Sequence, residues 1–198
     1  MNLVERQPSF HTVRDEPPPP PPVDRETFQR WAERQERRYE WVRGEIVMMT
    51  ETSRGHALII TRLVVALAKV LDLDRYAIAT SDFGVNTGDS RRFPDVLVEP
   101  VSPDLKGRTS EAPIFIAEVL SPSSVSIDMR EKAAEYTGLA SLRTYAVFSQ
   151  DGPQVWVWER GEEGFPEKPT SVEGRDKRLA IPALGASLPL AEIYRNLG

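Results

Sequence analysis

The sequence predicts a mixed α/β (α+β) domain built around one central sheet, on three observations. First, apolar segments of strand and helix character follow one another in mixed order, which is typical of sheets flanked by helices. Second, the length of 198 residues fits one domain with its own core. Third, residues 114–120 are almost continuously apolar, the pattern of a strand covered on both faces.

Local signals mark the first elements in chain order. Asp24 is a suitable N-cap for a helix that begins at residue 25. Residues 39–42 and 45–49 are two short strands that flank a two-residue turn, which predicts a β-hairpin. The segment 54–71 has apolar residues at helical spacing over most of its circumference. We therefore expect a helix there, buried against the sheet.

The second half of the chain supplies most of the expected sheet. We expect strands at 76–80, 83–86, 95–99, 113–120, 144–149 and 154–159, and helices at 126–139 and 190–196. The polar segment 100–112 and the charged segment 160–177 are rich in residues typical of loops. Both are therefore predicted to be surface loops.

The N-terminal segment has a composition of its own. Residues 17–22 are six consecutive prolines, which cannot join a helix or a central strand. We therefore expect residues 1–23 to form a proline-rich tail and residues 24–198 to form a single domain. The tail is interpreted first as a spacer, and the alternative is a ligand for an aromatic groove on another protein.

Composition excludes several classes of protein. The absence of cysteine rules out disulfides, thiolate zinc sites and a cysteine nucleophile, and two histidines leave little room for a multi-histidine metal site. A net charge of −5 argues against coating nucleic acid by bulk charge, although a local basic groove stays possible. Without an apolar run of 18 residues or a signal-peptide pattern, we expect a cytoplasmic protein with no membrane segment.

Two carboxylates stand out in the predicted sheet. Strand alternation places Glu118 on the same face as the apolar residues Ile114, Ile116 and Leu120. A buried carboxylate needs a cation, a metal or a proton. Asp95 opens a preceding strand, so two neighbouring strands would present hard oxygen ligands suited to Mg²⁺ or Mn²⁺. The alternatives are a Glu118 that reaches water and an Asp95 that caps a turn.

The helix that follows offers a cation for this pair. Asp128, Lys132 and Tyr136 recur at intervals of four residues, on one side of the expected helix. Lys132 borders the apolar stripe, so its stem can lie along apolar surface while its amine reaches a carboxylate cluster. The alternative is a solvated ion pair between Asp128 and Lys132.

The ordered set of motifs resembles the bacterial putative restriction endonuclease family of the PD-(D/E)xK nuclease superfamily. The resemblance covers residues 24–196, and its motifs are Tyr39-Glu40, Gly44-Glu45, Gly55-His56, Pro94-Asp95, Glu118 to Ser123, Asp128, Lys132, Tyr136 and Thr144 to Val147. It implies a restriction-endonuclease-like core, a central mixed sheet flanked by helices. The superfamily lysine stands two residues after the glutamate, where this chain has Leu120. The resemblance implies that Lys132 takes that role from the helix.

The implied activity is Mg²⁺-dependent (or Mn²⁺-dependent) endonucleolytic hydrolysis of DNA. Asp95, Glu118 and Lys132 are the expected catalytic residues, and Asp95, Glu118 and the backbone carbonyl of Val119 are the expected metal ligands. Accessory candidates are Glu40 (favoured) or Glu45 as an outer ligand, His56 as a phosphate contact or a local cap, Asp128 and Tyr136. Candidate DNA contacts are Arg54, Arg62, Arg91 and Arg92. Ser121 and Ser123 are expected to shape the turn after the strand.

Other interpretations stay open at this point. One is a nuclease-fold protein that no longer cleaves and serves as a binding or assembly module. Another is a hydrolase of a small phosphate ester, which would have a closed pocket. Trp156 and Trp158 share one face of a late strand. That face needs cover, and the two candidates are a second subunit, which predicts a homodimer, and the loop 160–177.

Overall fold

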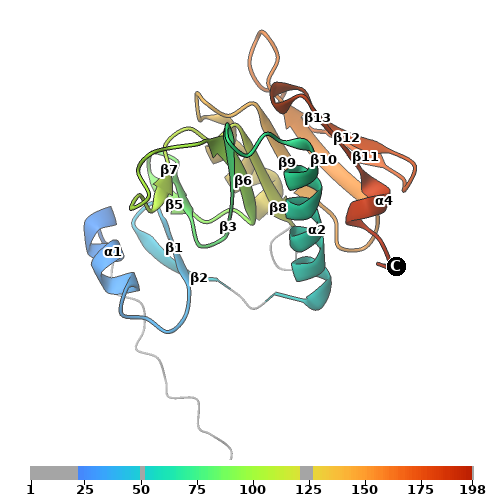
Figure 1. The fold of residues 1–198 in the computed structure, drawn as a ribbon. Coiled ribbons are helices and arrows are strands. Elements are labelled where there is room, and N and C mark those ends of the chain that lie inside the picture. The colour runs from blue at the N-terminus through green and yellow to red at the C-terminus, as the bar shows by residue number, and fades with distance from the viewer. Residues whose placement is uncertain (1–21, 50–51, 121–126, 198) are drawn as a thin grey trace, which may run out of the picture.

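Three sheets and a few short helices make up the fold in the computed structural model, which describes residues 22–49, 52–120 and 127–197 (Figure 1). The six-stranded sheet contains, in spatial order, β11 (Thr170–Glu173), β10 (Gln154–Glu159), β9 (Thr144–Phe148), β8 (Phe115–Val119), β6 (Val96–Pro100) and β3 (Tyr76–Thr80). β8 and β9 are parallel, and the other pairs are antiparallel. The expected mixed sheet is therefore confirmed.

A smaller sheet lies beside the first and carries the predicted hairpin. Its order is β2 (Glu45–Met48), β1 (Tyr39–Val42), β5 (Ser90–Arg92), β4 (Gly84–Asn86) and β7 (Thr109–Ser110). The turn between β1 and β2 uses Arg43 and Gly44 with φ of 51° and 92°. Two residues in the left-handed region are what a tight hairpin of this kind requires. A separate antiparallel pair is formed by β12 (Arg178–Ile181) and β13 (Ala186–Pro189).

The first helix begins at its predicted cap, and the second at a cap that was not predicted from the sequence. α1 (Arg25–Ala32) is capped by Asp24, whose side chain accepts a 2.7 Å bond from the Thr27 amide, and α2 (Arg54–Val70) is capped by Ser53. The remaining helical segments are the π-helix η1 (Ile127–Lys132), α3 (Ala133–Thr137), the 3₁₀ turn η2 (Pro182–Leu184) and α4 (Leu190–Ile193). α4 is shorter than expected. α2 buries only one face, since Val65 and Val70 are about half exposed.

Two apolar clusters cover opposite faces of the large sheet. The cluster on the α2 side contains Phe115, Ala117 and Val119 of β8, and the cluster on the α3 side contains Ile116 and Leu120. The alternation predicted around Glu118 therefore holds within β8. Ile114 is the exception, because it precedes the strand and packs with the α2-side cluster. Its carbonyl accepts two successive amides, those of Arg143 and Thr144, which breaks the regular alternation.

The predicted loops contain strands that the sequence did not reveal. Residues 160–177 include β11, which pairs with β10, and residues 100–112 include β7. β11 is a polar edge strand, and it joins the sheet through backbone hydrogen bonds that leave no hydrophobic pattern. No helix among the described residues is both long and apolar enough to cross a membrane.

The tryptophan face is covered within the chain. Trp158 is buried and lies 5.3 Å from the Tyr145 ring, centroid to centroid. Trp156 and Phe165, which comes from the segment 160–177, pack against the same cluster. The tryptophans therefore do not require a second subunit, and the homodimer stays a prediction without their support.

Candidate active site

The two predicted carboxylates lie where β6 begins and β8 ends: Asp95 immediately precedes β6, and Glu118 is the penultimate residue of β8. The antiparallel register pairs Val96 of β6 with Ala117 of β8, so the next positions outward are Asp95 and Glu118. Glu118 is 3% exposed and Asp95 is 9% exposed. The Val119 amide, next to Glu118 in β8, donates to Asp95, so the fold brings the two acidic residues near each other where water has little access.

Asp95 is held by one backbone and one side-chain donor. Its Oδ2 accepts a 2.7 Å bond from the Val119 amide, and its Oδ1 lies 3.2 Å from Nε2 of His56. His56 comes from the first turn of α2, where its own amide is bonded to the Ser53 cap. The sequence suggested a phosphate contact or a local cap for this histidine. In the structure its ring instead contacts a predicted metal ligand.

Glu118 is held from the helix that follows β8. Its Oε1 accepts hydrogen bonds from Nζ of Lys132 at 2.9 Å and from the hydroxyl of Tyr136 at 3.0 Å. The amine of Lys132 also lies 3.1 Å from Oδ1 of Asp128. The side chain of Lys132 therefore reaches Glu118 although Leu120 occupies the usual lysine position. Tyr145 completes the support, since its hydroxyl donates to the Asp128 carbonyl at 2.9 Å.

The segment that carries Lys132 is a π-helix and not the regular α-helix that the spacing predicted. It runs over Ile127–Lys132 and passes directly into α3. π-helical turns are rare, and they are frequent at functional sites. Apolar periodicity contains no signal for this wider turn, so the sequence could not reveal it.

Burial and neighbouring charges set the protonation of this cluster. Burial raises the pKa of Glu118 well above its ordinary value, and Asp95, Asp128 and Glu40 raise it further, while Lys132 offsets part of the effect. Burial opposes the charge of Lys132, yet the carboxylates of Glu118, Glu40 and Asp128 together raise the pKa of its ammonium. Burial, followed by the charge of Glu118, also raises the pKa of Tyr136. At neutral pH Lys132 is therefore a cation and Tyr136 a neutral donor.

Glu40 is buried near this cluster, and its carboxylate is paired with the guanidinium of Arg92. Nη1 of Arg92 lies 3.0 Å from Oε2 of Glu40, and the Phe93 amide donates to Oε1 at 3.1 Å. The same guanidinium makes two 2.8 Å bonds to Glu135 of α3. Arg92 is 2% exposed. The prediction of Arg92 as a DNA contact is therefore corrected: it links the small sheet to α3.

Glu135 is the member of this network that sequence reasoning missed. It also accepts bonds from Thr87 and Ser90, and lies 3.8 Å from Arg43. Burial opposes its charge, but the bonds from Arg92 keep the pKa of Glu135 below its ordinary value. The only sequence signal was its position three residues after Lys132, on the same side of a helix.

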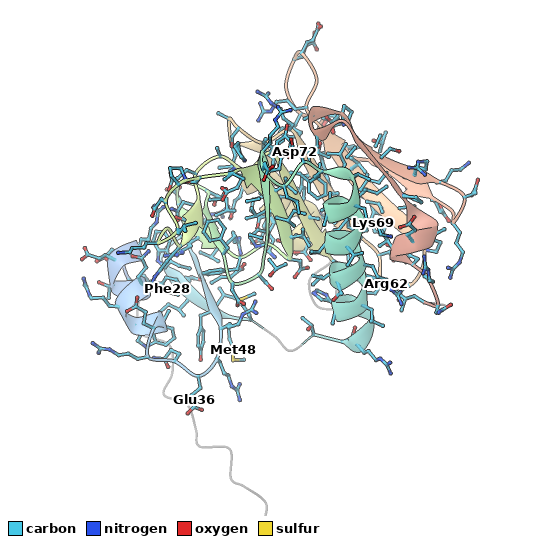
Figure 2. All side chains as sticks on the ribbon, viewed as in Figure 1. Phe28, Glu36, Met48, Arg62, Lys69 and Asp72 are labelled. Carbon is cyan, nitrogen blue, oxygen red and sulfur yellow. The ribbon has the colours of Figure 1, made fainter. Side chains whose placement is uncertain are left out.

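The other predicted residues lie apart from the carboxylate pair. Glu45 is exposed at the turn end of the hairpin, so the prediction of a ligand there is not supported. Arg54 is exposed at the start of α2. Arg62 donates at 3.4 Å to the carbonyl of Ile193, and Figure 2 shows it on α2 near α4. Its described contact is thus structural. Arg91 is buried away from the pair, and Ser121 and Ser123 lie outside the described residues.

The carboxylate oxygens of Asp95 and Glu118 are the ligand type that a hard divalent cation prefers. The described residues contain no group of three or more histidine and acidic side chains that could bind a metal ion by themselves. Mg²⁺ is commonly bound through one or two carboxylates, with waters and substrate phosphate as the other ligands. Lys132 and Tyr136 both contact Oε1 of Glu118, so these two bonds do not use Oε2. Asp95 and Glu118 therefore fit a Mg²⁺ or Mn²⁺ site that substrate completes.

The mixed sheet flanked by helices is the architecture of a restriction-endonuclease-like fold, and it brings Asp95, Glu118 and Lys132 into one region. The chain belongs to the Uma2 family, described as "Putative restriction endonuclease", whose model matches residues 25–191. It is 28% identical over 175 residues to an uncharacterized protein of Synechocystis, slr1290, covering 87% of this chain and 91% of that protein.

The fold is also seen in a crystal structure from Anabaena variabilis. That protein is described as a putative nuclease belonging to DUF820. The two structures agree with a TM-score of 0.67 at 15% sequence identity, over 81% of this chain and 91% of the other. At this identity the similarity establishes the fold alone.

Proposed function

We propose that this protein is a divalent-metal-dependent endonuclease that hydrolyses phosphodiester bonds in DNA. The observation that carries the proposal is the 2.9 Å contact of the Lys132 amine with Glu118, next to the Val119 amide that binds Asp95. Two carboxylates and one amine are the groups that this hydrolysis requires. Membership of the family described as "Putative restriction endonuclease" supports the same activity.

Asp95, Glu118 and the backbone carbonyl of Val119 would hold Mg²⁺ or Mn²⁺. When bound, such an ion polarises the phosphodiester and lowers the pKa of a water ligand. His56 and the Val119 amide fix the orientation of Asp95, and Tyr136 fixes that of Glu118. These three groups are positioning elements, and partners of this kind strengthen metal binding by about 10- to 100-fold.

Lys132 acts as an electrostatic group in this mechanism. Three carboxylates raise the pKa of its ammonium, so it keeps its proton at neutral pH and is a poor general base. A fixed cation in a water-poor site stabilises the negative charge that develops on the phosphate in the transition state. Lys132 has three N–H donors, and the one that is not directed at Glu118 or Asp128 can also orient the attacking water. Lys132 is therefore proposed to lower the barrier by charge stabilisation.

Cleavage of supercoiled plasmid in Mg²⁺ and in Mn²⁺ tests this proposal. We expect nicking and linearisation by the wild type, and losses of at least 100-fold in Asp95→Asn, Glu118→Gln and Lys132→Met. Glu45→Gln is the matched control, because Glu45 is an exposed carboxylate outside the cluster. A wild type that binds plasmid but leaves it intact with both metals would support the alternative, a binding or assembly module that has lost catalysis.

We also propose a cellular location and an assembly state. We propose a cytoplasmic protein, where its DNA substrate is accessible, and a homodimer that presents two active sites to the two strands. Sedimentation equilibrium at micromolar concentration measures the assembly directly. A monomer there would contradict the dimer and leave the proposed chemistry untouched.

A further inference from the structure

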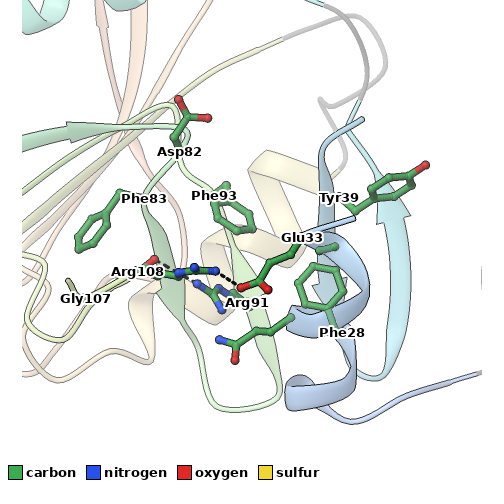
Figure 3. A pocket seen from close by; sticks show the side chains of 11 residues that line it. Phe28, Glu33, Tyr39, Asp82, Phe83, Arg91, Phe93, Gly107 and Arg108 are labelled. Atoms are coloured by element: carbon green, nitrogen blue, oxygen red, sulfur yellow. Dashed lines mark hydrogen bonds and ion pairs between the residues drawn. The ribbon is translucent and has the colours of Figure 1, made fainter. Parts of the chain in front are cut away.

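A cavity of about 410 Å³ lies between α1 and the small sheet, away from the carboxylate pair (Figure 3). Its lining combines aromatic rings, among them Phe83 and Phe93, with the guanidinium groups of Arg91 and Arg108 and the carboxylates of Glu33 and Asp82. The volume falls within the range of small-molecule sites, about 300–1,000 Å³. Aromatic walls with a few charged groups are also typical of such sites.

Arg91 is the unusual member of the lining, and its neighbour Arg92 provides the comparison. The two residues are consecutive in β5, so their side chains project from opposite faces. Arg92 is bonded to two carboxylates, those of Glu40 and Glu135. Arg91 is 4% exposed, and among the described residues it takes part in no ion pair. Of these two adjacent arginines, Arg92 is therefore paired with carboxylates on one face of β5, whereas Arg91 has no carboxylate partner among the described residues on the other face.

The hydrogen bonds of Arg91 leave much of its capacity unused. Its Nη2 donates at 3.1 Å to the carbonyl of Arg108, while Nε has no partner among the described residues. A buried guanidinium without an anion is costly. Burial, together with the charges of Arg108 and Arg25, lowers the pKa of Arg91. An anionic ligand in the cavity would offset this cost.

Arg108 supplies a second cation that a ligand can recruit. It forms an ion pair with Glu33, and Figure 3 shows this pair next to Arg91. The Arg108 and Glu33 side chains are 66% and 53% exposed. Exposed ion pairs contribute little to stability, with a median of about 0–1 kcal/mol. A phosphate group can therefore displace Glu33 and bind Arg108 and Arg91 together.

The aromatic part of the lining suits a planar ring. Phe83 and Phe93 are partly exposed, and the Arg91 guanidinium lies 5.6 Å from the centroid of the Phe93 ring. Nucleobases stack on aromatic rings and on arginine planes. Gly84 permits this close packing, since a Cβ there would lie 3.1 Å from Nε of Arg91 and 3.3 Å from the Phe93 ring.

We propose that this cavity is a nucleotide-binding site, with the phosphate on Arg91 and Arg108 and the base against Phe83 and Phe93. The nucleotide is either a free mononucleotide or an unpaired nucleotide of a DNA strand, which present the same phosphate and base. The cavity opens on the face of β5 opposite to Arg92 and the carboxylate network. Binding there therefore stands whether or not the protein cleaves DNA.

Isothermal titration calorimetry of the full chain in EDTA tests the site without metal or hydrolysis. The ligands are deoxyadenosine 5′-monophosphate, deoxyadenosine and a short 5′-phosphorylated single strand. We expect the monophosphate to bind at least tenfold more tightly than the nucleoside, and Arg91→Met to weaken it at least tenfold. Arg178→Met is the control, because Arg178 lies on β12, far from α1 in the fold (Figure 1).

Two exposed residues keep the test decisive if Arg91→Met does not fold. Arg108→Met should weaken the monophosphate severalfold. Glu33→Gln should strengthen it severalfold, because it removes the carboxylate that competes with phosphate for Arg108. A single strand that binds tenfold more tightly than the monophosphate identifies the unpaired strand as the source, and equal affinities identify the free nucleotide. The proposal would be overturned if neither the monophosphate nor the single strand binds, or if Glu33→Gln binds the monophosphate more weakly than the wild type.

Discussion

The substitution Glu118→Gln separates a metal site from a purely structural ion pair. At 2.9 Å and an effective dielectric constant of about 20, the attraction between Glu118 and Lys132 is about 6 kcal/mol. Burial of the carboxylate costs several kcal/mol, and Asp95, Asp128 and Glu40 repel it. The pKa of Glu118 is raised, so the opposing effects exceed the attraction. We therefore expect the metal-free variant to be as stable as the wild type at pH 7, or more stable.

The pH dependence of the same comparison has a definite sign. Between the ordinary pKa of 4.5 and the raised folded-state pKa of Glu118, the folded state binds more protons than the unfolded state. The free energy of unfolding then falls as pH rises through this window. Glutamine does not ionise, so the stability of the variant relative to the wild type should increase as pH rises above about 4.5. Urea denaturation between pH 4.5 and 8 measures this difference.

Thermal melts with and without Mg²⁺ complete the assay. At a Mg²⁺ concentration tenfold above Kd, the wild type gains about 1.4 kcal/mol, which raises Tm by about 3–6 °C in a domain of this size. The variant lacks one anionic ligand and should gain almost nothing. Asp128 stays beside the ammonium, so Lys132 is not stranded. A drop of about 3–5 kcal/mol without metal, the cost of breaking a structural buried pair, would refute the reasoning.

Three further substitutions have separate expected outcomes. Arg92→Met should destabilise the fold by about 3–5 kcal/mol, because it leaves two buried carboxylates without their cation, whereas Arg30→Met, in an exposed pair, should cost less than about 1 kcal/mol in urea denaturation. His56→Ala should weaken Mg²⁺ binding by about 10- to 100-fold in calorimetry, because Asp95 loses an orienting partner; unchanged affinity would contradict that role. Lys132→Met should abolish cleavage yet bind Mg²⁺ at least as tightly, because the competing cation is gone; weaker binding would contradict it.

The predictable parts of the fold are those with a local pattern. The hairpin follows from its two-residue turn, and α2 follows from its apolar spacing. The placement of Glu118 follows from alternation along a single strand, because burial on both faces leaves a carboxylate conspicuous. Edge strands such as β11 lack that pattern, since β11 is polar apart from Val172, which packs at the margin of the α2-side cluster.

The unpredictable parts of the site depend on pairing between distant segments. Arg91 and Arg92 are adjacent and chemically identical, and only the insertion of β5 between β1 and β4 decides which one meets Glu40. The contact between His56 and Asp95 joins residues 39 apart and requires the start of α2 to reach the beginning of β6. Neither relation leaves a trace in composition or spacing.

The most direct test of the proposed metal centre is a crystal soaked in Mn²⁺ and measured near the manganese absorption edge. We predict one strong anomalous peak within coordination distance of the Asp95 and Glu118 carboxylates, lost in Glu118→Gln crystals soaked in the same way. A map with no peak between these carboxylates, and with Glu118 still bonded to Lys132, would contradict the metal centre.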